Sequence, residues 1–326
     1  MNAGLLVRFF IGTVGVIGTI TNTIAFVLLL YHKYGSKLTN ILFRAQCVYE
    51  GFGCFIMFLR QIFPEVALTN LIFFDRLFCM LWSQDNLFWP GPILAASNLV
   101  CISLDRLIAV FRPIFYRSRQ RFLLLVFTSY NVINVLVLFT PQLARRQLVN
   151  GTCTFHFVLD DYRLNILGSI QAYMLVLFTY ALPCLFIITS HAIIIWKIRK
   201  IYKSALENSN PSQIRTSSST STDDDQEQLR SSPVRRLIIM TVILSTLYII
   251  CHSMEAFTYA LATSGVLNYI DNPVQQQMGL GLMVLCGCIS PLVIACSTKQ
   301  LLLKVVNTLR WYAKITFTRM AVVSQP

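Results

Sequence analysis

Ionisable side chains inside long apolar stretches are the residues of this sequence that could do chemistry. Asp105 and Arg106 are neighbours at the end of one stretch, and Glu50 lies in the middle of another. In a third stretch His252 and Glu255 are three residues apart, so a helix places them on one face. Ionisable groups in membrane-spanning helices are energetically costly and usually functional. Ligand binding and ion pairing are therefore the chemistry that we expect.

Enzymatic chemistry is not indicated, because the residue clusters that membrane enzymes use are missing from the sequence. No His-Glu-x-x-His motif, no Gly-x-Ser-x-Gly elbow and no P-loop is present. The four histidines, His32, His156, His191 and His252, are scattered over different stretches. We therefore expect neither an enzyme nor a cofactor nor a metal site.

The stretches that hold these residues are long enough to cross a membrane. The chain has 326 residues, 55% of them hydrophobic and only 13% charged, against roughly 25% charged in soluble domains. Its net charge of +13 would suggest nucleic acid in a soluble chain. Here the basic residues border apolar runs, where they set membrane orientation, so nucleic-acid binding is excluded. Seven apolar windows of about 20 residues or more predict spans at residues 5–31, 40–63, 78–111, 122–143, 167–197, 234–261 and 274–296.

The basic residues predict the orientation of the chain. Of the 27 Lys and Arg residues, six fall on one side of the predicted membrane and all others on the opposite side. The six are Arg8, Arg60, Arg76, Arg145, Arg146 and Arg163. Cytoplasmic loops collect Lys and Arg, so the N-terminus is expected outside and the C-terminus inside. No small-residue cleavage site stands out after the first apolar run, which predicts a retained anchor.

The sequence divides into a membrane domain and a short tail. Residues 1–297 form the predicted bundle, and residues 198–233 within it are a polar, Ser/Thr-rich cytoplasmic loop expected to be disordered. In residues 217–225, Ser and Thr hydroxyls precede three acids, a pattern that suits phosphorylation by an acid-directed kinase and then binding of arrestin. The alternative is a solvated linker without such a role. In residues 298–326, apolar side chains recur at helical spacing, which predicts an amphipathic helix on the inner membrane face.

Local motifs resemble those of rhodopsin-like (class A) G-protein-coupled receptors over nearly the whole chain. Asp105 and Arg106 in SLDRLIAVFRP resemble the family's Asp/Glu-Arg-Tyr motif, and Ser290-Pro291 resembles its Asn-Pro-x-x-Tyr motif. Further positions that agree in register are Asn22, Glu50 in place of Asp, Pro183, and Cys251-His252-Ser253-Met254 in place of Cys-Trp-x-Pro. The resemblance implies an all-α bundle of seven transmembrane helices in the plasma membrane. The departures are similar to those of divergent invertebrate orphan and neuropeptide receptors.

The resemblance also implies roles for single residues. Arg106 would be released from Asp105 to meet a heterotrimeric G-protein, whereas the alternative is an arginine that extends to the membrane interface. His191, His252, Ser290 and Pro291 stand at the family's switching positions, and Asn22 and Glu50 in its buried polar core. A disulfide between Cys79 and Cys153 matches the family, and Asn150 begins a glycosylation acceptor on the predicted outer side.

A sodium ion at Glu50 is not expected. In the family the equivalent acid binds sodium with help from polar neighbours, but Ala95, His252 and Ser290 stand where those neighbours would be. Glu50 is then either protonated or bonded to His252 or Ser290.

Two ligand classes of the family, retinal and the biogenic amines, each require a particular residue that this chain lacks. A light receptor needs a Lys in residues 274–296, which contain none, and amine receptors carry an Asp eighteen residues before Arg106, where this chain has Phe88. The cavity candidates are Trp82, Asp85, Phe88, Trp89, Glu255, Tyr259 and Gln276. Their mixture of aromatic and acidic groups suits a peptide with an Arg and an amidated aromatic end.

Several alternatives remain open at this point. Glu255 could form a structural pair with a neighbouring helix, and Asp85 could face solvent in a loop. The ligand could be a small chemosensory molecule. A transporter or channel is the alternative class, but it predicts internal repeats or paired broken helices, and the sequence shows no convincing repeat.

Overall fold

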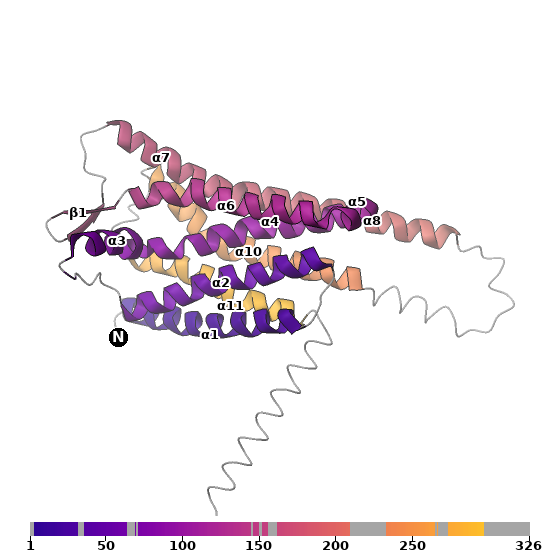
Figure 1. The fold of residues 1–326 in the computed structure, drawn as a ribbon, viewed down its shortest axis with the longest axis horizontal. Coiled ribbons are helices and arrows are strands. Elements are labelled where there is room, and N and C mark those ends of the chain that lie inside the picture. Colours follow the sequence, from indigo (N-terminus) through magenta and orange to yellow (C-terminus); the bar gives the residue numbers. More distant parts are fainter. Residues whose placement is uncertain are drawn as a thin grey trace, which may run out of the picture.

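A computed structural model describes residues 3–31, 36–63, 69, 71–144, 146–149, 152–155, 162–208, 233–264, 266 and 273–296. Seven helical segments in these residues are long and apolar enough to cross a membrane, and they run along one common axis (Figure 1). They are α1 (Ala3–Tyr31), α2 (Lys37–Ile62), α4 (Pro90–Phe111), α6 (Gln120–Ala144), the segment α7–η2–α8, α10 (Pro233–Thr263) and α11 (Pro273–Cys296). The predicted all-α seven-helix membrane bundle is confirmed.

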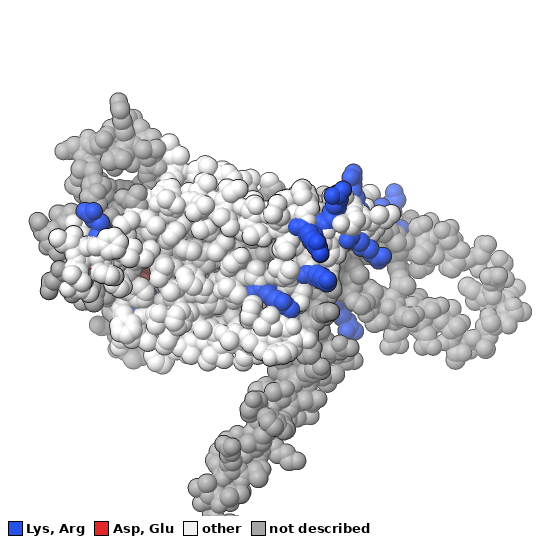
Figure 2. Space-filling view, viewed as in Figure 1, with Lys and Arg blue, Asp and Glu red and all other residues white. Residues whose placement is uncertain are grey.

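The two ends of the bundle differ in structure and charge. At one end, Cys79 of α3 (Ile72–Trp82) forms a disulfide with Cys153 of β2 (Thr152–Phe155), which confirms the predicted pair. The strand β2 pairs antiparallel with β1 (Arg146–Val149) in a short hairpin. At the other end, where α5 (Pro113–Ser118) lies, the Lys and Arg side chains gather (Figures 1 and 2). These are called the disulfide end and the basic end below.

Glycines bring α1 and α2 close together. A Cβ atom on Gly18 would lie 2.6 Å from the Cys54 sulfur, and one on Gly15 would lie 2.9 Å from the Cys54 carbonyl oxygen. In a membrane, no hydrophobic effect drives helices together, because lipid tails are as apolar as the side chains. Small residues at the contacts let the backbones come close enough for van der Waals packing to hold them.

The third span begins later than the sequence predicted. Residues 78–111 were expected to form one span, but α3 ends at Trp82 and a 3-10 helix, η1 (Ser83–Phe88), separates it from α4. Pro90 opens α4, where its missing N–H costs no helical hydrogen bond. A proline run inside a continuous apolar stretch therefore marked the start of a helix.

The fifth span contains a π-helical turn and runs further than predicted. It consists of α7 (Tyr162–Val176), the π-turn η2 (Leu177–Ala181) and α8 (Leu182–Asn208). The predicted disordered loop, residues 198–233, therefore begins as helix, and its residues 209–232 lie outside the described residues. The predicted tail helix in residues 298–326 and the predicted glycosylation site Asn150 lie outside them too.

Candidate functional site

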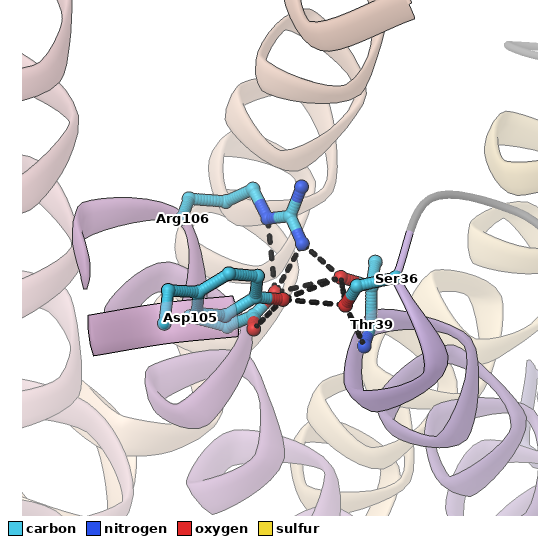
Figure 3. A network of polar contacts seen from close by, with 5 residues as sticks. Ser36, Thr39, Asp105 and Arg106 are labelled. Atoms are coloured by element: carbon cyan, nitrogen blue, oxygen red, sulfur yellow. Dashed lines mark hydrogen bonds and ion pairs between the residues drawn. The ribbon is translucent and has the colours of Figure 1, made fainter. Parts of the chain in front are cut away.

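A polar network holds Asp105 and Arg106 at the basic end (Figure 3). Both residues are buried near the end of α4, and the Arg106 guanidinium donates to the Asp105 carboxylate and to the Thr39 hydroxyl. Thr39 donates to the same carboxylate over 3.0 Å, and Tyr116 donates to it over 2.7 Å. Arg106 thus lies within the bundle and does not extend to the membrane interface, which was the alternative.

Residues from three elements build this network. Ser36 caps the start of α2 by accepting a hydrogen bond from the Thr39 N–H over 3.1 Å, which fixes Thr39 opposite α4. Its hydroxyl also contacts that of Tyr116 on the short helix α5. Burial, and next the charge of Asp105, raise the pKa of Tyr116 above its ordinary value of 10.0. Tyr116 therefore keeps its proton and remains a donor to Asp105 at physiological pH.

A chain of amides leads from α4 to Glu50 in the middle of the bundle. The Asn98 side chain donates to the Gln46 oxygen over 2.8 Å, and the Gln46 amide donates to Glu50 Oε1 over 2.8 Å. Gln46 is the partner that sequence reasoning missed, although it lies one helical turn before Glu50. Glu50, Ala95 and His252 line one cavity.

Two prolines leave carbonyl groups without their helical donors, and side chains of neighbouring helices bond to both. Pro291 cannot donate to the carbonyl of Gly287, four residues earlier, and the Asn22 amide of α1 donates to that oxygen over 2.7 Å. Asn22 is thus a buried link between α1 and α11, in the place that the resemblance implied. Ser290, next to Pro291, donates to the Cys286 carbonyl over 2.9 Å.

The second proline creates a link between the fifth and sixth spans. Pro183 has no N–H to supply the α-helical bond to the Thr179 carbonyl in η2, four residues earlier, and the Tyr248 hydroxyl of α10 bonds to that carbonyl. In return, the Tyr180 hydroxyl donates to the Ile249 carbonyl over 3.3 Å. The Tyr248 ring stacks on His252 with their centroids 4.1 Å apart. These reciprocal bonds, called the tyrosine link below, were missed by sequence reasoning because Tyr248 is an ordinary residue in an apolar stretch.

Nearer the basic end, a second contact ties the same two spans. His191 Nε2 lies 3.1 Å from the Ser245 hydroxyl, and both residues are buried. His191, which the resemblance placed among the switching residues, therefore lies at the contact between α8 and α10.

An acidic and aromatic cavity lies in the disulfide-end half of the bundle. Its walls come from the start of α4 and from α7, η2, α10 and α11. The lining residues are Trp89, Leu175, Val176, Thr179, Tyr180, Tyr248, His252, Glu255, Ala256, Tyr259 and Met283. Its volume of about 30 Å³ is room for one or two water molecules. In this conformation the cavity has no free space for a larger ligand.

The predicted cavity residues divide into two groups. Trp89, Glu255 and Tyr259 line the cavity as expected. Phe88 instead packs in the core against Gly53 and lines the neighbouring cavity at Glu50. Gln276 is half-buried on α11 and is not among the lining residues.

Two further candidates lie at the disulfide end and have partners within the protein. Asp85 is buried, so it does not face solvent as the alternative proposed, and it forms an ion pair with Arg60 over 2.9 Å. Gln277 of α11 donates to its second oxygen over 3.3 Å. Asp85 has a φ of 62°, a left-handed conformation that Asp tolerates better than most residues. The Trp82 indole donates to the Phe63 carbonyl over 2.7 Å.

The described part of the chain combines seven spans with a disulfide at one end, a buried Asp-Arg pair at the other and a cavity between them. These features define a seven-helix membrane receptor. The sequence model of the 7 transmembrane receptor (rhodopsin family) matches residues 21–293. The chain therefore belongs to the rhodopsin family of seven-transmembrane receptors, which are receptors rather than enzymes, and it is a multi-pass protein of the plasma membrane. A comparison with curated proteins finds no match.

Proposed function

We propose that this receptor binds an extracellular peptide and activates a heterotrimeric G-protein in the cytoplasm. The basic end faces the cytoplasm in this proposal, since Lys and Arg collect on the cytoplasmic side and gather at that end (Figure 2). The disulfide fits the opposite, oxidising side.

The polar network at Asp105 and Arg106 is the observation that carries the coupling. A G-protein segment can use Arg106 only after the guanidinium leaves Asp105 and Thr39, so the network holds the uncoupled state. Ligand binding activates the receptor by favouring a state of the bundle in which these bonds are broken. The chemistry is then done by the G-protein, and the receptor supplies the change in shape.

A peptide ligand is supported by the chemistry of the cavity. Glu255 supplies a carboxylate among the aromatic rings of Trp89 and Tyr259, which suits a basic residue next to an aromatic one in the peptide.

The cytoplasmic loop with its hydroxyls and acids at residues 217–225 is the proposed site of a kinase and of arrestin.

Nucleotide exchange on a panel of Gα subunits tests the coupling. The wild type is compared with Arg106→Ala at equal surface expression, with and without a peptide library. Arg117→Ala on α5, an exposed Arg at the same end, is the matched control. We expect exchange with the wild type and the control and none with Arg106→Ala. Exchange that persists in Arg106→Ala would refute the proposed role of this residue.

A further inference from the structure

One carboxylate stands among aromatic side chains in the wall of the cavity. Glu255 shares the lining with Trp89, Tyr180, Tyr248 and Tyr259, and none of the residues that line the cavity is a Lys or Arg. Within the described part of the chain, an entering ligand therefore meets an acidic and aromatic surface that includes His252 but no Lys or Arg.

The carboxylate of Glu255 is held in a defined place between α10 and α11. The residue is 3% exposed, and a Cβ atom on Gly279 would lie 2.3 Å from its Oε2 atom. Only a glycine at position 279 leaves room for the carboxylate in this position. Glu255 therefore reaches across to the backbone of α11 rather than into lipid.

Aromatic rings stand beside this acid. The ring centroids of Trp89 and Tyr259 are 6.5 Å apart with their planes inclined by 42°, and Tyr259 lies one helical turn after Glu255 on the same face. Aromatic faces attract cations, and the attraction grows where water is excluded.

The other acids near this region do not line this cavity. Asp85 is paired with Arg60, and Glu50 lies at the neighbouring cavity, where Gln46 donates to it. Phe88 occupies the third-span position at which an amine receptor would carry its acid, and it is buried in the core. Glu255 is thus the acid that the cavity offers to a ligand.

We propose that the cavity takes a cationic group of the ligand, a guanidinium or an alkylammonium, which pairs with Glu255 and lies against Trp89 and Tyr259. This inference rests on the proposed receptor function and names the chemistry that its ligand must carry. Such a group has more heavy atoms than the one or two water molecules for which the cavity has room, so its entry displaces side chains of the cavity wall. Tyr248 and Thr179, which form the tyrosine link, line the same cavity. Binding of the cation therefore acts directly on the contact between the fifth and sixth spans.

Thermal unfolding of the purified full-length receptor in lipid nanodiscs tests the proposal with two sets of matched probes. The first set is a library of amidated tetrapeptides that contain Arg, compared with the same peptides containing citrulline, its neutral isostere. The second is phenethylamine at millimolar concentration, compared with 2-phenylethanol. We expect a cationic probe to raise the unfolding midpoint of the wild type and its neutral counterpart to leave it unchanged. Stabilisation in the first set identifies a peptide as the source of the cation, and stabilisation in the second identifies a small amine.

Variants show whether Glu255 receives the charge. Glu255→Gln is expected to weaken binding of the cationic probe by about 30-fold or more, as for removal of one partner of a buried charge pair. Gly279→Ala keeps the charge but forces the carboxylate to move, so weaker binding is expected here too, which tests the site if Glu255→Gln does not fold. Asp75→Asn is the matched control, because Asp75 is a buried acid near the disulfide end that is held by Thr69 and lies outside the cavity.

Three results would overturn the proposal: equal stabilisation by neutral and cationic probes, unchanged binding in both Glu255→Gln and Gly279→Ala, or no stabilisation of the wild type by any cationic probe. The readout does not involve a G-protein. A receptor that binds cations through Glu255 but promotes no nucleotide exchange would refute the proposed coupling and leave the ligand site standing.

Discussion

Removal of the Tyr116 hydroxyl should release part of the network that holds Arg106. Tyr116→Phe deletes the hydrogen bond to Asp105, which measures 2.7 Å, together with the contacts of the same hydroxyl with Ser36 and Thr39. The bonds from Thr39 and Arg106 to Asp105 stay in place. A hydrogen bond to a charged group contributes about 1.5–3 kcal/mol, and the lower value applies because Asp105 keeps other donors. A loss of about 1.4 kcal/mol changes an equilibrium tenfold. If this bond is absent from the active state, in which the network is broken, the substitution weakens only the inactive state. The population of the active state then rises about tenfold, for example from about 1% to about 10%.

The assay is ligand-independent nucleotide exchange at equal surface expression, in which Tyr116→Phe should exceed the wild type about tenfold. Tyr31→Phe is the control, since Tyr31 is an exposed tyrosine at the end of α1 nearest the basic end and its hydroxyl has no role in the network. An unchanged or lower basal exchange in Tyr116→Phe, with normal expression, would show that the network does not restrain the receptor.

Three further predictions concern the packing of the bundle. Tyr248→Phe leaves the Thr179 carbonyl without its donor, and since an unsatisfied buried polar group costs about 1–3 kcal/mol, the unfolding temperature should fall and basal exchange should rise. Gly18→Ala should destabilise the protein by about 1–3 kcal/mol through overpacking against the Cys54 sulfur, whereas Gly4→Ala, with no neighbouring atom within 4 Å, should leave the unfolding temperature unchanged. Cys79→Ser opens a disulfide that links residues 74 positions apart, so a loss of about 4 kcal/mol should appear in thermal unfolding and surface expression.

The spans could be predicted from the sequence because the membrane imposes them. Each helix must cross the apolar layer with about 20 mostly apolar residues and satisfy its backbone hydrogen bonds internally, so length and hydropathy place the seven windows. The observed third span starts later than the predicted one and the fifth contains a π-turn, and a proline stands close to each of these irregular turns. Pro90 begins α4 after the break at η1, and Pro183 follows the π-turn η2. Hydropathy does not detect such changes in backbone geometry.

The partners of the site residues were harder to predict, because most of them lie far along the chain. Asp105 and Arg106 were visible as adjacent charges, but the folded chain brings Thr39 to them from 66 residues away. The ion pair of Asp85 with Arg60 depends on how η1 packs on the end of α2. Glu255 could be placed on one face with Tyr259 from helical spacing, whereas its position against the backbone of α11 required the structure.

In the proposed mechanism, the cavity at Glu255 and the network at Arg106 bias one equilibrium of the bundle. Coupling between two sites is reciprocal, so a G-protein must raise the affinity for ligand by the same factor by which the ligand raises affinity for the G-protein. The most direct measurement is the affinity of the cationic probe that stabilises the receptor, determined with and without nucleotide-free G-protein. We expect this affinity to rise about 5-fold to 150-fold in the wild type and not at all in Arg106→Ala. A probe affinity that is the same with and without the G-protein in the wild type would contradict the proposed mechanism.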